Sequence, residues 1–137
     1  MRFTTALAVS AALTVAGLAD PAAAHHSFAM FDMAKTVTFK GVVKQVQWAN
    51  PHVWVEMAVD EGGTLKAYSF EAGAVAVLKR AGWAKDTLKV GDSVSIVTHP
   101  FKNGRTGGSL QSVTLANGRT LSAADAIPGA LLAPTQK

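Results

Sequence analysis

The sequence contains no cysteine among its 137 residues. Disulfide bonds and thiolate chemistry are therefore excluded, although disulfides persist in the compartments that receive small exported proteins. Charged residues make up only 16%, and the lysines and arginines are spread along the chain, so the formal net charge of +4 provides no polybasic arm for nucleic acid. Apart from a run at the N-terminus, the apolar stretches are too short to suggest a membrane span. We expect one small domain.

The longest apolar run, residues 6–19, follows Arg2 at the N-terminus. An Asp-Pro pair breaks the run, and alanines at 22–24 then place small residues at the −3 and −1 positions of a cleavage site. This pattern is typical of a cleavable signal peptide over residues 1–24. We therefore expect export to the bacterial periplasm and a soluble mature chain that begins at or beside His25.

Strand patterns follow a short arm at residues 25–34. Residues 36–48 alternate, with a change of phase at Gly41 that predicts a bulge or tight bend. The clearest strand alternates at period two, and its apolar face is formed by Val53, Val55, Met57 and Val59. After a Gly-Gly turn, residues 64–71 predict a third strand.

A short helix is predicted over residues 72–81, because apolar residues recur there at helical spacing and Gly82 stands where a helix C-terminal glycine belongs. Two further strands follow, over residues 93–99 and 109–115. The tetrapeptide Asn-Gly-Arg-Thr begins at Asn103 and again at Asn117, on either side of the later strand. Asn-Gly predicts type I′ turns, in which both central residues have positive φ.

The predicted order is three strands, a helix, two strands and a short extra strand. This order favours a mainly β fold, a five- to six-stranded antiparallel barrel of the oligonucleotide/oligosaccharide-binding (OB) type, with its short helix between the third and fourth strands. A small antiparallel sandwich is the alternative. The barrel domain is expected over residues 25–121, and residues 122–137, rich in Ala, Pro and Gly, are expected to form a flexible tail.

The predicted cleavage site exposes a pair of histidines. Cleavage after residue 24 makes His25 the first residue, and its amino group and ring nitrogen suit Cu(II) or Ni(II). Cleavage one residue earlier places His26 third, which allows a square-planar copper site of amine, amide and imidazole nitrogens. Met30 lies close by as a soft ligand for Cu(I). The alternative interpretation is a flexible polar end without a metal function in the cell.

A second cluster follows the Asn50-Pro51 turn. Because side chains alternate along a strand, one face presents His52, Trp54 and Glu56. This face, which Trp48 precedes and shields, is a candidate ligand-binding surface. The alternative is that Trp54 only packs and His52 only caps the turn. His99 ends a later strand, and we expect it to join His52 as a metal ligand only if those two strands are neighbours.

The residues form no catalytic constellation. Glu56 and Glu71 are both carboxylates, but their spacing does not place them at the roughly 5–10 Å that glycoside chemistry needs. Ser27 lies beside two histidines and lacks an elbow motif and a positioned acid. The remaining candidates are glycines expected in a hairpin turn rather than in a phosphate-binding loop, namely Gly104, Gly107 and Gly108. Nucleic acid is not an expected partner, because the positive charge is dispersed.

Several motifs are spread over residues 25–121. They are His25-His26-Ser27-Phe28, Trp48-Ala49-Asn50-Pro51-His52-Val53-Trp54, Gly82-Trp83 and Leu88-Lys89-Val90-Gly91-Asp92. In these motifs the chain resembles a bacterial family of small exported proteins of unknown function. The resemblance implies export and a compact β-rich domain, and it supplies no activity or ligand.

The leading hypothesis is a periplasmic, non-enzymatic binding protein. Its copper ligands are expected to come from His25 and His26, with His52 or His99 in addition. The alternative is a docking module that binds an envelope protein or polymer through exposed tryptophans, Trp48, Trp54 and Trp83.

Overall fold

The computed structural model describes residues 29–123. Within this range the strands and the helix follow one another in the order that the sequence predicts. They are β1 (Val37–Gln47), β2 (Trp54–Glu61), β3 (Thr64–Glu71), α2 (Val75–Arg80), β4 (Ser93–Pro100), β5 (Gly107–Thr114) and β6 (Thr120–Ser122). The predicted helix between the third and fourth strands is confirmed.

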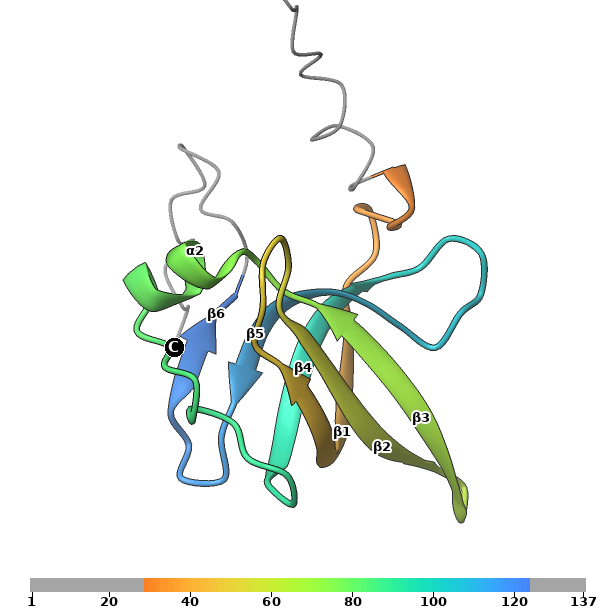
Figure 1. Cartoon of the computed structure of the whole chain (residues 1–137). Helices are drawn as coiled ribbons and strands as arrows, with labels where there is room; N and C mark the ends of the chain where they lie inside the picture. The colour runs from red at the N-terminus through yellow and green to blue at the C-terminus, as the bar shows by residue number, and fades with distance from the viewer. Residues whose placement is uncertain (1–28, 124–137) are drawn as a thin grey trace, which may run out of the picture.

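A parallel pairing between β3 and β5 closes the sheet into a barrel. The strands follow the order β3-β2-β1-β4-β5-β6, and the ring closes where residues 69–71 pair with residues 107–109. Figure 1 shows α2 and β6 on one side of the barrel and the β2–β3 hairpin on the other. The five strands of the ring and the extra strand β6 confirm the OB-like barrel, and the sandwich alternative is wrong.

Two glycines allow this closure. A Cβ on Gly107 would stand 1.9 Å from the backbone oxygen of Ser69, and one on Gly108 would stand 2.0 Å from the backbone oxygen of His99. The neighbouring strands therefore approach β5 so closely that no side chain fits at either position. The sequence prediction that these glycines lie in a hairpin turn is wrong, because they are buried at the start of β5.

The barrel interior receives alternate residues from its strands. The predicted apolar face of the second strand is confirmed, since Val53, Val55, Met57 and Val59 are all buried. Burial of an apolar side chain of this size contributes about 1.5–3 kcal/mol. Across the interior, the ring of Phe39 on β1 lies 4.7 Å from that of Tyr68 on β3, centroid to centroid. The core thus joins strands that are not neighbours in the sheet.

β1 bends where its inward face changes phase. Its register with β2 shifts around Lys44, so the bulge lies three residues after the predicted position at Gly41. Val43 is consequently fully buried, and Val42 is only half-buried. Gly41 is required for another reason, because a Cβ there would stand 2.2 Å from the backbone oxygen of Ala58.

The two Asn-Gly-Arg-Thr repeats form matching turns. In each turn the asparagine Oδ1 accepts a hydrogen bond from the N–H two residues later, at 3.1 Å in residues 103–105 and 3.0 Å in residues 117–119. Gly104 and Gly118 have positive φ, but within residues 29–123 no other residue type does. A type I′ turn needs positive φ at both central residues, so the predicted turn type is wrong.

α2 ends as its sequence predicts. Gly82 has a φ of +89°, and the next N–H, that of Trp83, donates to the carbonyl of Leu78 at 3.0 Å. The indole of Trp83 then enters the core, where its Nε1–H donates to the carbonyl of Ser122 at 2.6 Å and joins the helix to β6. In the described range, no helix has the length and apolar character needed to cross a membrane.

Candidate functional site

Segments from distant parts of the chain gather along one edge of the barrel, at the top in Figure 1. They are the arm at residues 29–36, the β1–β2 loop at 48–53 and the β4–β5 loop at 101–106, beside the last residue of β3. We call this edge, which includes Glu71 and His99, the upper rim. The β2–β3 turn at residues 62–63 lies at the opposite end of the hairpin and is called the lower turn.

On the upper rim, His52 contacts Glu71. Nδ1 of the imidazole lies 2.9 Å from Oε1 of the carboxylate and 3.3 Å from the backbone oxygen of Ala72. Both oxygens accept hydrogen bonds, so Nδ1 carries the hydrogen and Nε2 of the neutral ring keeps its lone pair. The carboxylate side chain is 10% exposed and the imidazole 34%. A shielded carboxylate thus orients a half-exposed imidazole.

Hydrogen bonds hold the β1–β2 loop on the end of β3. The N–H of Val53 donates to the carbonyl of Gly73 at 3.2 Å, and the N–H of Ala72 donates to the carbonyl of Val53 at 2.8 Å. Oδ1 of Asn50 accepts from the N–H of Val75 at 3.2 Å. The loop is therefore tied to the first turn of α2 as well as to β3, and the histidine inside it has a fixed backbone.

His99 stands on the same rim, two strands away from Glu71. Ser109 pairs with Glu71 on one side and with His99 on the other. Neighbouring strands lie about 4.8 Å apart, so the backbones of Glu71 and His99 are separated by roughly 10 Å. β2 and β4 are not neighbours in the sheet. His99 is therefore linked to the His52–Glu71 pair through Ser109, which lies between Glu71 and His99 in the sheet.

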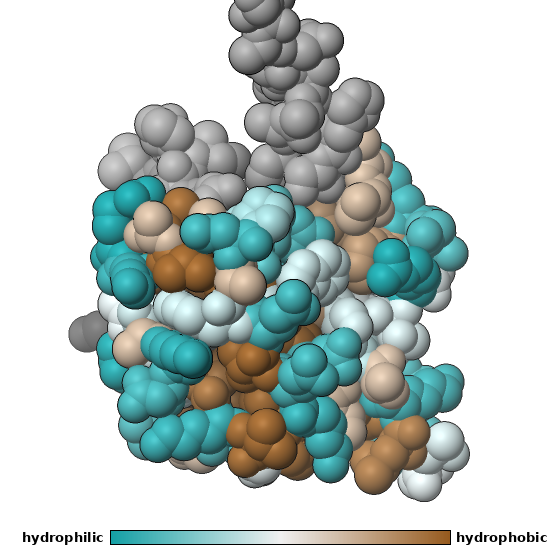
Figure 2. Space-filling view, in the orientation of Figure 1, coloured by the Kyte–Doolittle hydropathy of each residue, from teal (hydrophilic) through white to brown (hydrophobic). Residues whose placement is uncertain are grey.

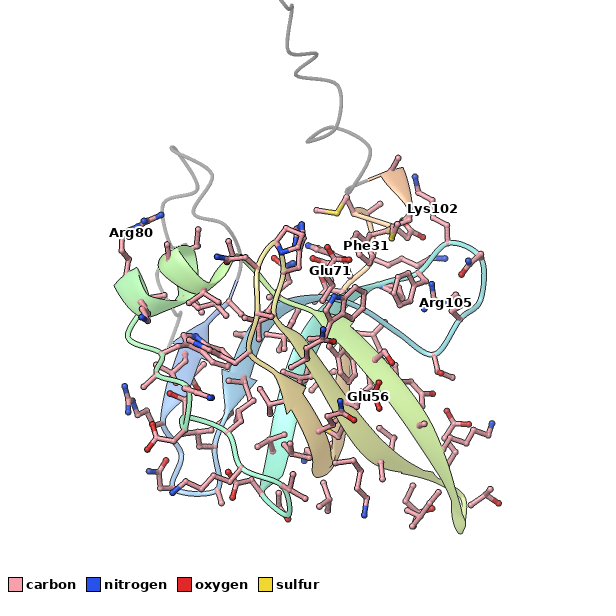
Figure 3. The ribbon with its side chains drawn as sticks, in the orientation of Figure 1. Phe31, Glu56, Glu71, Arg80, Lys102 and Arg105 are labelled. Carbon is pink, nitrogen blue, oxygen red and sulfur yellow. The ribbon has the colours of Figure 1, made fainter. Side chains whose placement is uncertain are left out.

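The arm is anchored by Phe31, which is 1% exposed. Its ring lies 5.0 Å from the ring of Phe101, centroid to centroid. The guanidinium of Arg105 stands 4.6 Å from the centroid of the Phe101 ring. Figure 3 shows Phe31, Glu71, Lys102 and Arg105 together on the upper rim. Sequence reasoning missed this anchor, because a single phenylalanine in a short arm gives no periodic signal.

The predicted aromatic face is partly formed. Trp54 and Glu56 point outward from β2, opposite Glu71 and Ser69 of β3 respectively. Trp54 is half-buried and Glu56 is exposed, and Trp48 packs in part against the core. Figure 2 shows hydrophilic residues interspersed with smaller apolar areas across the visible face. Trp83 is 4% exposed, so its predicted role as an exposed docking residue is wrong.

The predicted metal ligands lie partly inside and partly outside the described residues. His25 and His26 lie outside the described residues. Within residues 29–123, no three His, Cys, Asp or Glu side chains are grouped so as to hold a metal ion. A metal site of such ligands at His52 therefore needs further ligands from outside this range.

A second polar cluster lies beside the lower turn. The carboxylate of Glu61 accepts hydrogen bonds from the ammonium of Lys66 and the hydroxyl of Tyr68. These two donors, the ammonium first, hold the pKa of Glu61 below its usual value. The same carboxylate, together with burial, raises the pKa of Tyr68 to about 12. The cluster ties the two strands of the hairpin together through residues that are close in the sequence.

The fold and the rim define the class of this protein. A closed five-stranded barrel with a helix after its third strand, and with a histidine–carboxylate pair on one rim, is a small OB-like barrel protein. The chain belongs to a family of unknown function (DUF6152), whose model matches residues 11–111. No curated protein and no solved structure matches it. Neither the fold nor the family assigns an activity.

Proposed function

We propose that this protein is an exported, non-enzymatic copper-binding protein of the bacterial periplasm. Its Cu(II) ligands are the terminal amine and the imidazoles supplied by His25 and His26, together with Nε2 of His52. The observation that supports this proposal best is the 2.9 Å contact between Nδ1 of His52 and Oε1 of Glu71.

This contact has the form of an outer-shell interaction at a metal site. Histidines that bind metals usually donate their second ring N–H to a carboxylate or carbonyl, which fixes the tautomer and increases the basicity of the other nitrogen. His52 has both kinds of acceptor, Glu71 and the carbonyl of Ala72. The shielded carboxylate also places a negative charge next to a bound divalent cation, which favours the cation electrostatically.

The described arm begins on the same rim as this imidazole. The carbonyl of Met30 accepts a hydrogen bond from the N–H of Lys102 at 2.9 Å, so the described arm begins on the upper rim. The four Cα-to-Cα steps from His25 to Ala29 span at most about 14 Å when extended. Amine and imidazole nitrogens are ligands that Cu(II) prefers. We therefore expect the four proposed nitrogen donors to meet without a change in the barrel.

The test begins with the full chain, exported with its own leader and purified from the periplasm. Intact mass spectrometry reports the cleavage position and the bound metal together. Competition with a chelator of known affinity then gives the Cu(II) affinity of the protein and of a peptide with residues 25–34. We expect the protein to bind at least about tenfold more tightly, because His52 adds a ligand that Glu71 orients.

Matched variants separate the site from the fold. E71Q is expected to lower the Cu(II) affinity by about 10–100-fold, as is typical for the loss of an outer-shell partner. E61Q, which changes the carboxylate at the other end of the hairpin, is expected to leave the affinity unchanged. Equal affinities for protein and peptide, or equal effects of E71Q and E61Q, would contradict the proposal.

A docking module is the second candidate function. It is supported by the two half-buried indoles of Trp48 and Trp54, which lie close to the upper rim, with Glu56 exposed on the same outward face of β2. W54A should then abolish recovery of an envelope protein or polymer that copurifies with the wild type, while the melting curve remains cooperative. Unchanged recovery would exclude Trp54 from docking.

A further inference from the structure

The arm exposes two thioether side chains. Met30 and Met33 are each 44% exposed, whereas Met57 in the barrel is 1% exposed and Phe31 between the arm methionines is also 1% exposed. Methionine side chains are usually buried. The arm thus has contact with the core through its phenylalanine and still presents both methionines to solvent.

Backbone hydrogen bonds fix the part of the rim on which these methionines stand. The N–H of Lys102 donates to the carbonyl of Met30 at 2.9 Å, and the N–H of Asp32 donates to the carbonyl of Pro100 at 2.8 Å. A turn then closes where the N–H of Lys35 donates to the carbonyl of Asp32 at 3.0 Å. The Cα atoms of Met30 and Met33 are three Cα-to-Cα steps apart, at most about 11 Å, which two flexible thioethers can bridge to reach one ion.

His99 faces the same turn from β4. Its Nδ1 lies 2.6 Å from the backbone oxygen of Lys35, two residues after Met33. A backbone carbonyl only accepts, so Nδ1 carries the hydrogen, and Nε2 of the neutral ring has a lone pair. Val37 pairs antiparallel with Thr98, and continuing this register places position 36, the residue after Lys35, opposite position 99. The imidazole of His99 is thus bonded to the turn that carries Met33, and Met30 lies three positions earlier in the same arm.

We propose that Met30, Met33 and His99 form a second metal site, which takes a soft monovalent cation, Cu(I) or Ag(I). Thioether and neutral imidazole ligands match the softness of these ions, and three such ligands leave the site with only the charge of the cation. Asp32, within the same turn, brings a carboxylate that pairs with Lys35 at 3.2 Å. The site has its own ligands and does not depend on the terminal Cu(II) site proposed above.

Titration of the mature chain with Ag(I) tests this site without any change of oxidation state. The methyl signals of ¹³C-labelled methionines report the ligands directly. We expect the Met30 and Met33 methyl signals to shift and saturate together, and the Met57 signal to stay in place as an internal control. M30L/M33L is expected to lower the Ag(I) affinity by more than about 100-fold, since a lost ligand costs more than a lost outer-shell partner. M57L is expected to bind like the wild type.

Other variants distinguish this proposal from the copper function. In H25A/H26A, Ag(I) binding with unchanged methyl shifts supports an independent site, whereas loss of Ag(I) binding overturns it. M30L/M33L is expected to keep its Cu(II) affinity. Met30 and Met33 signals that stay unshifted at saturating Ag(I) also overturn the proposal, even if Cu(II) binding at the terminus is found.

Discussion

The β2–β3 hairpin carries a carboxylate at each end, and the two are built differently. At the lower turn, Glu61 contacts Lys66 and Tyr68, and all three lie within one short stretch of sequence. At the upper rim, Glu71 contacts His52 from another loop and pairs with Ser109 across the barrel closure. Local contacts make the lower cluster, and contacts between distant segments make the upper one.

The two carboxylates also differ in what their partners can still do. The partners of Glu61 are an ammonium and a phenol, which are held as hydrogen-bond donors. The partner of Glu71 is an imidazole, whose second nitrogen keeps a lone pair beside a shielded negative charge. Glu71, unlike Glu61, is therefore part of a candidate site, because its partner His52 has a second nitrogen that can bind a ligand.

The largest expected effect breaks the barrel closure that assembles the upper rim. G107A is expected to cost at least about 3 kcal/mol of the free energy of unfolding, because its Cβ would overlap the backbone of Ser69 at a positive φ. G104A is the matched control, since its φ is also positive and nothing lies within 4 Å of the added Cβ, so about 1–2 kcal/mol is expected. Urea unfolding measures both, and equal losses would show that closure is not decided at Gly107.

The next largest effect compares a buried residue of the arm on the upper rim with an exposed residue near the lower turn. F31A is expected to cost about 3 kcal/mol, because a fully buried aromatic ring is lost from the arm. Hydrogen exchange of the amides in residues 30–35 should rise with it. L65A, near the lower turn at a residue that is 70% exposed, is expected to stay within about 0.5 kcal/mol of the wild type. An F31A loss as small as that of L65A would mean that the arm is not anchored through its ring.

The phenol at the lower turn gives a smaller, pH-dependent effect. The bond to Glu61 and burial raise the pKa of Tyr68 from 10.0 to about 12. Because the folded pKa is the higher one, this contribution is intact below pH 10 and is lost as the pH rises from 10 to 12, by about 1–2 kcal/mol. Absorbance titration of the chain's single tyrosine measures the pKa. E61Q should move it back toward 10.0, and a titration unchanged by E61Q would refute the contact.

The smallest effect concerns the ion pair at the lower turn. The ammonium of Lys66 is the main cause that holds the pKa of Glu61 below 4.5, with the hydroxyl of Tyr68 second. The stability from this pair is present above pH 4.5 and is lost as the pH falls through the lowered pKa. In K66A, carboxyl NMR should show the pKa of Glu61 closer to 4.5, with little change in thermal stability because the pair is exposed. A K40A control should leave this pKa in place.

Much of the local structure was predictable because its causes are local. Alternation fixed the inward face of β2, and Gly82 fixed the end of α2. Where the prediction was wrong, the local pattern was overridden by contact with another segment of the chain. The phase change of β1 lies at Lys44 because β2 pairs there, and Gly107 is a glycine because β3 passes beside it.

The sequence predicted several residues of the candidate site but not the contacts between them. Alternation correctly put Trp54 and Glu56 outside the barrel, but it gave no sign that Glu71 is the residue beside His52. Nor did the arm reveal that Phe31 is core while its flanking methionines are exposed. Pairings between segments far apart in sequence leave no periodic trace in either segment.

The sequence by itself determined the number and order of the strands, the single helix between the third and fourth, and the residues available as ligands. These follow from side-chain alternation, helix-ending glycine and residue chemistry, which act within a few positions. Only the tertiary structure decided which ligands meet. Pairing of β2 with β3 brings His52 to Glu71, and the seating of the arm brings His99 to the turn at residues 32–35, because strand register rather than distance along the chain sets the neighbours.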